Sequence, residues 1–242
     1  MLVRVALNIY GDEVDDRVKL TVNNYFNQLN HIFERLVGTC AMRSARRRCS
    51  EEDQDSDVES GGDFSMVRQS KNRVFFHVGV SRKTILDLIE KLEAAETYAL
   101  TNHLPCVLLF LHSEGGDAHA GLSGMNHIQN SRIPVHTVAD GFVASAATLL
   151  LLGGARRFGM EHSSVLIHQM STGFWGKYVE MIDEMHNTEQ MMEMIRTIYC
   201  SKTKLQRKRL EKTLKKEVTM TAAQCMELGI IQEFYKANSI IT

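Results

Sequence analysis

Three short segments of this sequence carry residue types that together can perform acyl transfer. Ser145 lies in GFVASAAT, His168 lies near the end of SSVLIHQ, and the pair Gly115 and Gly116 lies in HSEGGDAHAG. A serine hydroxyl becomes a nucleophile when a neighbouring histidine takes its proton, and a glycine turn lets backbone N–H groups approach a developing oxyanion. The segments therefore indicate nucleophilic catalysis if the fold brings them together.

Each of these segments also has an ordinary structural explanation. The glycine pair is consistent with a tight turn that needs positive φ angles, and it lacks the spacing of a nucleotide-binding loop. Ser145 is equally consistent with a helix N-cap, and His168 with a core histidine. His162 and His168 have no third residue at a metal-ligand spacing, so no metal site is predicted.

The three segments fall at the ends of predicted strands. From Arg73 onward the pattern predicts strand 74–80, helix 84–100, strand 105–113, helix 118–129, strand 133–140, helix 145–152, strand 163–169 and a long helix 177–202. Most of the strands are continuous apolar runs, which is typical of a largely parallel, covered sheet in an α/β fold. Functional groups in such folds gather at the C-terminal ends of strands, so we expect Gly115, Gly116, Ser145 and His168 to converge.

A sharp change in composition divides the chain. Residues 43–48 hold four arginines, and residues 51–63 hold seven acids and almost no apolar side chains. Such a stretch buries too little surface to offset the entropy of ordering it. We therefore predict an N-terminal extension over 1–41, made of a strand (2–10) and a helix (18–37), then a charged flexible linker or loop over 42–65, and a main domain over 66–242.

Composition also excludes several classes of function. The chain has 28 Lys plus Arg against 29 Asp plus Glu, so no global field favours nucleic acid. The basic run 201–216 has no interleaved aromatic residues for base stacking, and the longest apolar stretch, about 143–152, is too short to span a membrane. Five scattered cysteines without a CxxC pair, and no secretory signal pattern, favour reduced thiols and a cytoplasmic location.

Four motifs, taken in order, resemble those of the ClpP peptidase family, the proteolytic subunit of caseinolytic (Clp) protease. They are HSEGGDAHAG, GFVASAATLLLLGG, SSVLIHQ and MTAAQCMELGII, and the resemblance covers about residues 73–234. It implies an α/β ClpP/crotonase-like fold of repeated β-β-α units with a projecting handle helix, which the long helix 177–202 matches. The chain then resembles a divergent member of the family with an N-terminal extension.

The resemblance also implies roles for individual residues. Ser145 matches the nucleophile and His168 the general base, while Gly116 and Ala146 match the donors of the oxyanion hole. Glu217 lies 49 residues after His168, which matches the position of the catalytic aspartate in the family. Residues expected beside the substrate are Gly115, Ser171, Thr172 and Gly173.

Two acids depart from the family pattern. Glu217 is one methylene longer than the usual aspartate, although glutamate also serves in hydrolase triads. Glu114 stands where proline is usual and places a negative charge near the acyl site. The alternative for Glu217 is a surface acid beside an incomplete triad, which would make the chain a noncatalytic ClpP-like subunit that assembles with or regulates another peptidase. A crotonase-like acyl-CoA enzyme is a further alternative, in which Ser145 and His168 have no necessary role.

The function that the resemblance implies is a serine endopeptidase acting on unfolded polypeptides without a metal or organic cofactor. The family forms stacked rings around an enclosed chamber and receives substrates from an ATP-dependent Clp unfoldase. We therefore expect a homo-oligomer with polypeptide substrates and a possible unfoldase partner, and no nucleic acid or membrane partner.

Overall fold

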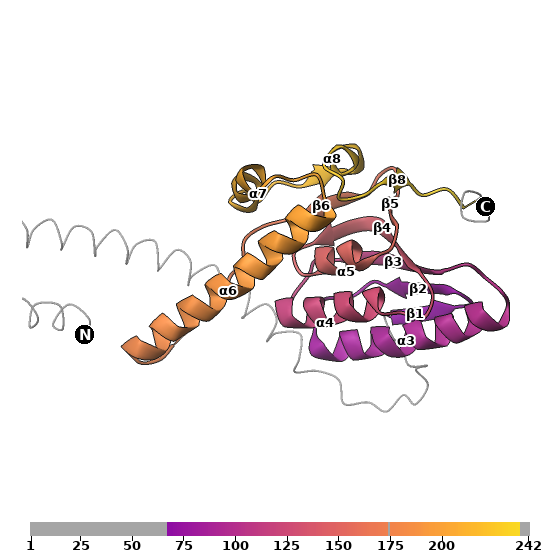
Figure 1. The fold of residues 1–242 in the computed structure, drawn as a ribbon, viewed down its shortest axis with the longest axis horizontal. Coiled ribbons are helices and arrows are strands. Elements are labelled where there is room, and N and C mark those ends of the chain that lie inside the picture. The colour runs from indigo at the N-terminus through magenta and orange to yellow at the C-terminus, as the bar shows by residue number, and fades with distance from the viewer. Residues whose placement is uncertain (1–66, 174, 238–242) are drawn as a thin grey trace, which may run out of the picture. The chain divides into compact units, whose positions relative to one another are not determined.

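The computed structural model describes residues 67–173 and 175–237 (Figure 1). The predicted strand 2–10, helix 18–37 and charged linker 42–65 lie outside these residues. The division into an extension, a linker and a main domain stays a prediction. Within the described residues, no helix combines the length and the apolar character that crossing a membrane requires.

A twisted, mostly parallel sheet forms the centre of the described fold. Its main path runs β1-β2-β3-β4-β5-β8, and these strands are Val67–Ser70, Arg73–Phe76, Val107–Ser113, Val135–Ala144, Arg157–Gly159 and Glu233–Phe234. Strand β1 pairs antiparallel with β2, whereas β2, β3, β4, β5 and β8 follow one another in parallel. The parallel register requires crossover connections, and helices supply several of them.

Three helices cover one face of this sheet, and a smaller apolar cluster lies on the other. The helices are α3 (Arg82–Thr101), α4 (Ala118–Gln129) and α5 (Ala147–Gly153), and all contribute to the main core (Figure 1). Side chains alternate along β3, so Leu109 enters the main core while Leu108 and Phe110 enter the second cluster. This burial on both faces explains the continuous apolar run of the strand.

Strand β4 is long enough to pair with two different strands on the same side. Its first half, Thr137–Ala139, pairs with β5, and its second half, Phe142–Ala144, pairs with β6 (Ser164–Leu166). Strand β6 in turn pairs antiparallel with β7 (Met220–Thr221). This fork places the C-terminal ends of β4 and β6 next to each other, so the residues that follow the two strands are neighbours.

The remaining helices follow β6 along the chain. They are α6 (Tyr178–Lys202), α7 (Arg207–Leu214) and α8 (Ala222–Glu227). Figure 1 shows α6 extending away from the sheet and its covering helices. The mixed α/β fold predicted from the sequence is confirmed, with a long helix where the handle was expected.

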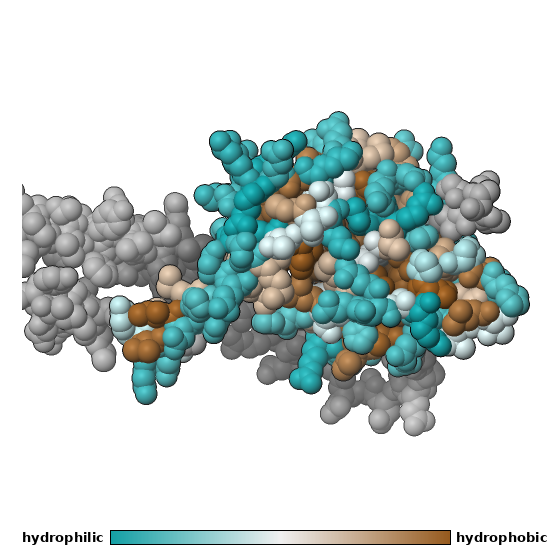
Figure 2. All heavy atoms as spheres, in the orientation of Figure 1, coloured by the Kyte–Doolittle hydropathy of each residue, from teal (hydrophilic) through white to brown (hydrophobic). Residues whose placement is uncertain are grey.

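The surroundings of α6 change along its length. Its C-terminal half packs into the main core through Met191, Met192, Ile195 and Tyr199. Its N-terminal half exposes Tyr178, Val179, Met181, Ile182 and Met185, and Figure 2 shows apolar side chains gathered at this projecting end. The apolar side chains of α6 therefore divide into a core part and an exposed part.

Several element boundaries differ from those predicted. The predicted strand 74–80 ends at Phe76, and Val80 forms only an isolated bridge with Gly116. The predicted helix 145–152 begins at Ala147, which leaves Ser145 in the turn before it. The basic run 201–216 contains the end of α6 and all of α7. The short strands β1, β5, β7 and β8 were not predicted, because no longer apolar run surrounds them, unlike β2 and β6.

Candidate active site

Ser145 occupies the turn that joins β4 to α5, and its backbone is left-handed, with φ of 53°. This region is uncommon for a residue with a Cβ atom and persists where the surroundings fix it. The Ser145 N–H donates to the Leu166 carbonyl at 2.9 Å, and the Ser145 carbonyl accepts from the Thr148 N–H at 3.0 Å. The turn is therefore fixed on one side by β6 and on the other by the first turn of α5.

Gly115 packs directly against the Ser145 turn. Its φ is 93°, and a Cβ atom at this position would lie 2.6 Å from both the Ala144 oxygen and the Ser145 Cβ. No side chain fits in that space, so glycine is needed for both its conformation and its size. The expected convergence of the glycine pair with Ser145 is thus present.

Gly116 and Ala146 each leave a backbone N–H without a hydrogen bond to any described residue. The two hydrogen bonds of the bridge between Val80 and Gly116 do not use the Gly116 N–H. The Val80 N–H donates to the Gly115 carbonyl at 2.7 Å, and the Asp117 N–H donates to the Val80 carbonyl at 2.9 Å. Ala146 immediately precedes α5, where initial N–H groups have no intrahelical partner. Two unpaired donors on adjoining turns are the kind of groups that bind an oxyanion.

His168 follows β6 and is fixed by the backbone on both sides. Ile167 is buried in the main core, and Gln169 N–H donates to the Leu214 carbonyl of α7 at 2.9 Å. The His168 side chain is mostly buried, and its Nδ1 lies 3.4 Å from Oε1 of Glu217. The structure therefore brings together the histidine and the acid that the family resemblance paired.

Glu217 reaches this position from the loop after α7. That loop begins with a turn in which Lys216 N–H donates to the Thr213 carbonyl at 2.9 Å. The Glu217 side chain is 75% exposed. A strong charge-assisted hydrogen bond is shorter, about 2.7 to 2.9 Å, so the contact with His168 is close but loose.

Ser145 and His168 lie at the ends of paired strands, but they share no hydrogen bond. The Ser145 hydroxyl makes no hydrogen bond to any residue in ranges 67–173 and 175–237. Catalytic hydrogen bonds are often long or poorly aligned before substrate binds. The three residues of a Ser-His-acid triad are therefore present, with a contact between His168 and Glu217 but no hydrogen bond between Ser145 and His168.

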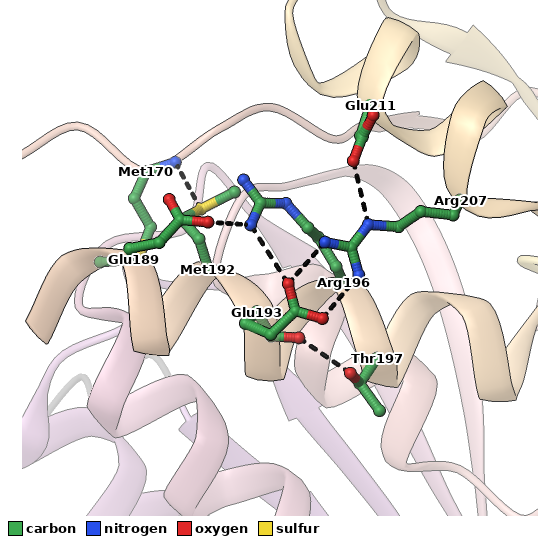
Figure 3. A network of polar contacts seen from close by, with 8 residues as sticks. All are labelled: Met170, Glu189, Met192, Glu193, Arg196, Thr197, Arg207 and Glu211. Carbon is green, nitrogen blue, oxygen red and sulfur yellow. Dashed lines mark hydrogen bonds and ion pairs between the residues drawn. The ribbon is translucent and has the colours of Figure 1, made fainter. Parts of the chain in front are cut away.

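A network of ion pairs ties α7 to α6 (Figure 3). Arg207 on α7 donates to both oxygens of Glu193 on α6, at 2.6 and 2.5 Å, and to Glu211 at 3.0 Å. Arg196 donates to Glu189 at 2.6 Å and also reaches Glu193. The hydrogen bonds from Arg207 lower the pKa of Glu193. The same hydrogen bonds to Glu193 raise the pKa of Arg207.

This network was not predicted from the sequence. The spacing of Arg207 and Glu211, four residues apart on one helix, could have indicated that one pair. Burial of Leu210 and Leu214 adds an apolar anchor for α7. Because α7 leads into the Glu217 loop, these contacts influence where the acid lies.

Of the four residues expected beside the substrate, Gly115 is buried against the Ser145 turn, and the other three lie in an exposed segment. Ser171, Thr172 and Gly173 are exposed and have no regular secondary structure. A Cβ atom at Gly173 would meet nothing within 4 Å. Beside them lies a groove of about 400 Å³ lined by Thr172, Met181, Glu184, Met185, Thr188 and Glu189. The segment is therefore open to an incoming chain.

Taken together, the fold and the site define an α/β protein in which a serine turn, a glycine turn and a histidine–acid pair meet beside the ends of β4 and β6. A model of the Clp protease family matches residues 62–238, which is most of the chain. The chain belongs to the Clp protease family. Its identification as a ClpP-like proteolytic subunit from the sequence is confirmed.

Curated relatives agree with this membership. The chain is 33% identical over 132 residues to "ATP-dependent Clp protease proteolytic subunit 2" of Treponema denticola, covering 54% of this chain and 66% of the relative. It is 31% identical over 163 residues to "ATP-dependent Clp protease proteolytic subunit 1" of Chlamydia abortus, covering 66% of this chain and 83% of the relative. A relative from Mesostigma viride is 29% identical and is covered over 56% of its length.

Proposed function

We propose that this chain is a serine endopeptidase with Ser145 as nucleophile, His168 as general base and Glu217 as the orienting acid. The observation that carries the proposal is the packing of Gly115 against the Ser145 turn. That packing places the unpaired N–H groups of Gly116 and Ala146 on turns adjoining Ser145. Membership of the Clp protease family supports peptide hydrolysis as the reaction.

The proposed reaction follows from the roles of the two histidine nitrogens. Because Nδ1 of His168 faces Glu217, Nε2 is left to take the proton from the Ser145 hydroxyl. The serine oxygen attacks the peptide carbonyl, and Gly116 and Ala146 N–H groups donate to the resulting oxyanion. His168 then protonates the departing amine, and water attacks the acyl-enzyme in a second step of the same kind.

We propose that the substrate is an unfolded polypeptide bound in an extended form. Ser171, Thr172 and Gly173 offer an exposed backbone beside the site, and an extended peptide can pair with such a segment by strand addition. Glu114 is exposed next to the glycine turn and places a carboxylate at its edge. A basic substrate side chain would find an opposite charge there.

The proposed assembly is a homo-oligomer of stacked rings around a chamber. The exposed apolar end of α6 supports it, because an apolar surface of this kind is normally covered by a partner. The family resemblance suggests that an ATP-dependent Clp unfoldase supplies substrates to the chamber. The relatives from Treponema denticola and Chlamydia abortus are themselves named as proteolytic subunits of an ATP-dependent protease.

A noncatalytic subunit is the second candidate function. The exposure of Glu217 and the open link between Ser145 and His168 favour it. The two candidates differ in whether the Ser145 hydroxyl is chemically activated, so a reagent for activated serines distinguishes them.

The deciding experiment is labelling of the full chain with a fluorophosphonate probe, with the adduct located by peptide mass spectrometry. A peptidase gives an adduct on Ser145 that is lost in Ser145→Ala and strongly reduced in His168→Ala. Ser123→Ala is the matched control, because Ser123 is exposed on α4 and has no place in the proposed site. Folded protein that forms no adduct would support the noncatalytic subunit.

A further inference from the structure

A buried hydroxyl lies directly beneath the Ser145 turn. Thr148, in the first turn of α5, has its Oγ1 2.6 Å from the Ser145 carbonyl oxygen. The same Oγ1 is hydrogen-bonded to the hydroxyl of Tyr199 on α6, which is 51 residues further along the chain. Thr148 is fully buried and Tyr199 nearly so. The three groups form a continuous path from α6 to the backbone of Ser145.

The direction of both hydrogen bonds follows from their chemistry. A carbonyl oxygen can only accept, so the Thr148 hydroxyl proton points to Ser145. Thr148 has a single hydroxyl proton, and Tyr199 must therefore be the donor to Thr148 Oγ1. Burial raises the pKa of Tyr199, which keeps its phenol protonated and able to donate.

These contacts act on the most constrained residue of the candidate site. Ser145 holds a left-handed backbone, and such a conformation persists only where its surroundings over-determine it. Its carbonyl accepts from both the N–H and the hydroxyl of Thr148, and its N–H is bound to β6. Rotation of the turn would break these bonds and leave the buried Thr148 hydroxyl without an acceptor for its proton.

We infer that Thr148 and Tyr199 are positioning residues that fix the Ser145 turn in its reactive orientation. The inference rests on the proposed function, because it concerns how the same nucleophile is aimed. Neither residue touches the substrate, because both side chains are buried. Tyr199 acts on Thr148, and Thr148 acts on the Ser145 carbonyl, so the packed part of α6 supports the nucleophile.

Two substitutions interrupt the hydrogen bonds from Tyr199 through Thr148 to Ser145 at different points. Tyr199→Phe deletes the outer donor and leaves Thr148 bound to Ser145. Thr148→Val keeps the size of the side chain, removes the contact with the Ser145 carbonyl and leaves the Tyr199 hydroxyl unpaired. Thr148→Ser retains the hydroxyl and serves as the conservative rescue. Controls are Tyr98→Phe and Thr101→Val, which make the same changes on α3, away from the site.

The measurement is the rate constant for labelling of Ser145 by the fluorophosphonate at saturating probe, with the labelled fraction recorded separately. The net contribution of one hydrogen bond corresponds to about two- to tenfold in rate, so Tyr199→Phe should label about two- to tenfold more slowly. Thr148→Val should label at least as slowly, and Thr148→Ser should recover most of the rate. Adding Tyr199→Phe to Thr148→Val should lower the labelling rate little further, because without the Thr148 hydroxyl Tyr199 no longer acts on Ser145.

The labelled fraction separates positioning from general stability. If the residues only stabilise the fold, the variants lose labelled fraction while the molecules that remain folded react at the original rate. That result, or labelling of Tyr199→Phe and Thr148→Val at the control rate, would overturn the inference. If the unmodified chain itself forms no adduct on Ser145, the proposed function fails instead, so the two failures are distinct.

Discussion

Nδ1 of His168 lies 3.4 Å from Oε1 of Glu217, and three-quarters of the Glu217 side-chain surface is exposed. An orienting acid in a hydrolase triad is usually buried, where a hydrogen bond is electrostatically stronger. An exposed carboxylate at this distance is screened by water and salt. Glu217 can therefore hold the imidazole tautomer, but with a smaller contribution to the rate.

We expect Glu217→Gln to lower kcat on a fluorogenic peptide by about tenfold, below the roughly 10⁴-fold loss at a buried triad acid. The reason is the loss of a solvent-screened charge that orients His168 and stabilises its protonated form. The melting temperature should not change, because the side chain is exposed. Glu227→Gln, an exposed acid at the end of α8, is the control. Unchanged turnover in Glu217→Gln would remove this residue from the triad.

Gly115→Ala should lower the rate of Ser145 labelling by about a hundredfold, the loss expected when reacting groups move by about 1 Å. The added methyl group would lie 2.6 Å from both Ala144 oxygen and Ser145 Cβ, so the two turns must separate. Gly79→Ala is the matched control, since a Cβ atom there would meet the Gly115 oxygen at an ordinary 3.6 Å. Equal rates in the two variants would show that Gly115 does not set the position of the nucleophile.

The features of the fold that the sequence predicts correctly are local ones. Helix α4 was predicted with its observed bounds, because the glycine pair marks the turn before it, and the structure adds a cap in which the Asp117 side chain accepts from the Ala120 N–H. Ser145 was expected shortly after a buried strand, but the predicted strand ends at 140, whereas β4 continues to Ala144 and brings Ser145 directly to the strand end. Glu217 came from the family resemblance alone, since the sequence around it has no feature that pairs it with His168.

The contacts that the sequence did not reveal join residues far apart in the chain. Thr148 and Tyr199 are 51 residues apart, and the carbonyls bound by the Arg157 guanidinium are 45 to 73 residues away from it. Thr148 and Tyr199 are ordinary members of helical patterns, and Arg157 is one of a basic pair. Their partners are determined only when α5, α6 and α8 have packed around the sheet.

Glu193 gives the contact between α6 and α7 a pH dependence. Arg207 lowers the Glu193 pKa below its ordinary value of 4.5, so this carboxylate contributes to stability above that pH. The contribution is lost as the pH falls through the lower pKa of the folded state. Glu193→Gln should therefore lower the melting temperature at pH 7 and have progressively less effect below about pH 4.5.

Thermal unfolding of the unmodified chain and Glu193→Gln between pH 7 and pH 3 provides the measurement. Asp183→Asn, at an exposed acid on the same helix, is the control. Hydrogen exchange should also quicken in residues 207–217, because α7 is released from α6. A difference in melting temperature between the two proteins that stays the same from pH 7 to pH 3 would contradict the role of the Glu193–Arg207 ion pair.

Arg157 is a buried cation bound by carbonyl groups. It donates to the carbonyls of Lys202, Gly229 and Ile230, at 2.7, 3.1 and 2.9 Å, and burial lowers its pKa. Lys202 ends α6, and the other two residues follow α8, so the guanidinium lies where helix dipoles favour positive charge. It links β5 to the ends of two helices.

Arg157→Met should lower the free energy of unfolding by about 3 kcal/mol, because it leaves two buried acceptors and one part-buried acceptor without a donor. This corresponds to a fall of roughly 6 to 12 °C in melting temperature at fixed protein concentration. Arg156→Met is the neighbouring control: its ion pair with Glu233 is about half exposed, so the loss should be about 1 kcal/mol or less. A similar loss of unfolding free energy in both variants would show that the carbonyl contacts of Arg157 contribute no more to stability than the exposed ion pair of Arg156.

The apolar end of α6 predicts how assembly responds to an added charge. Met185 is 73% exposed there, beside Val179, Met181 and Ile182. If this surface is an interface between copies of the chain, Met185→Glu must bury a carboxylate among apolar groups on association, and the oligomer should dissociate. Sedimentation velocity of the unmodified chain and of Met185→Glu measures this directly.

Leu100→Glu places the same charge on an exposed apolar position of α3 and should leave the oligomer intact. A single small species for the unmodified chain would contradict the chamber. An oligomer that survives Met185→Glu but dissociates in Leu100→Glu would move the interface from α6 to α3. If α6 is the interface, labelling of Ser145 in the assembled unmodified chain and in dissociated Met185→Glu will show whether the nucleophile needs assembly. Such a dependence is expected because Tyr199, on the same helix, is hydrogen-bonded to Thr148 beside the Ser145 turn.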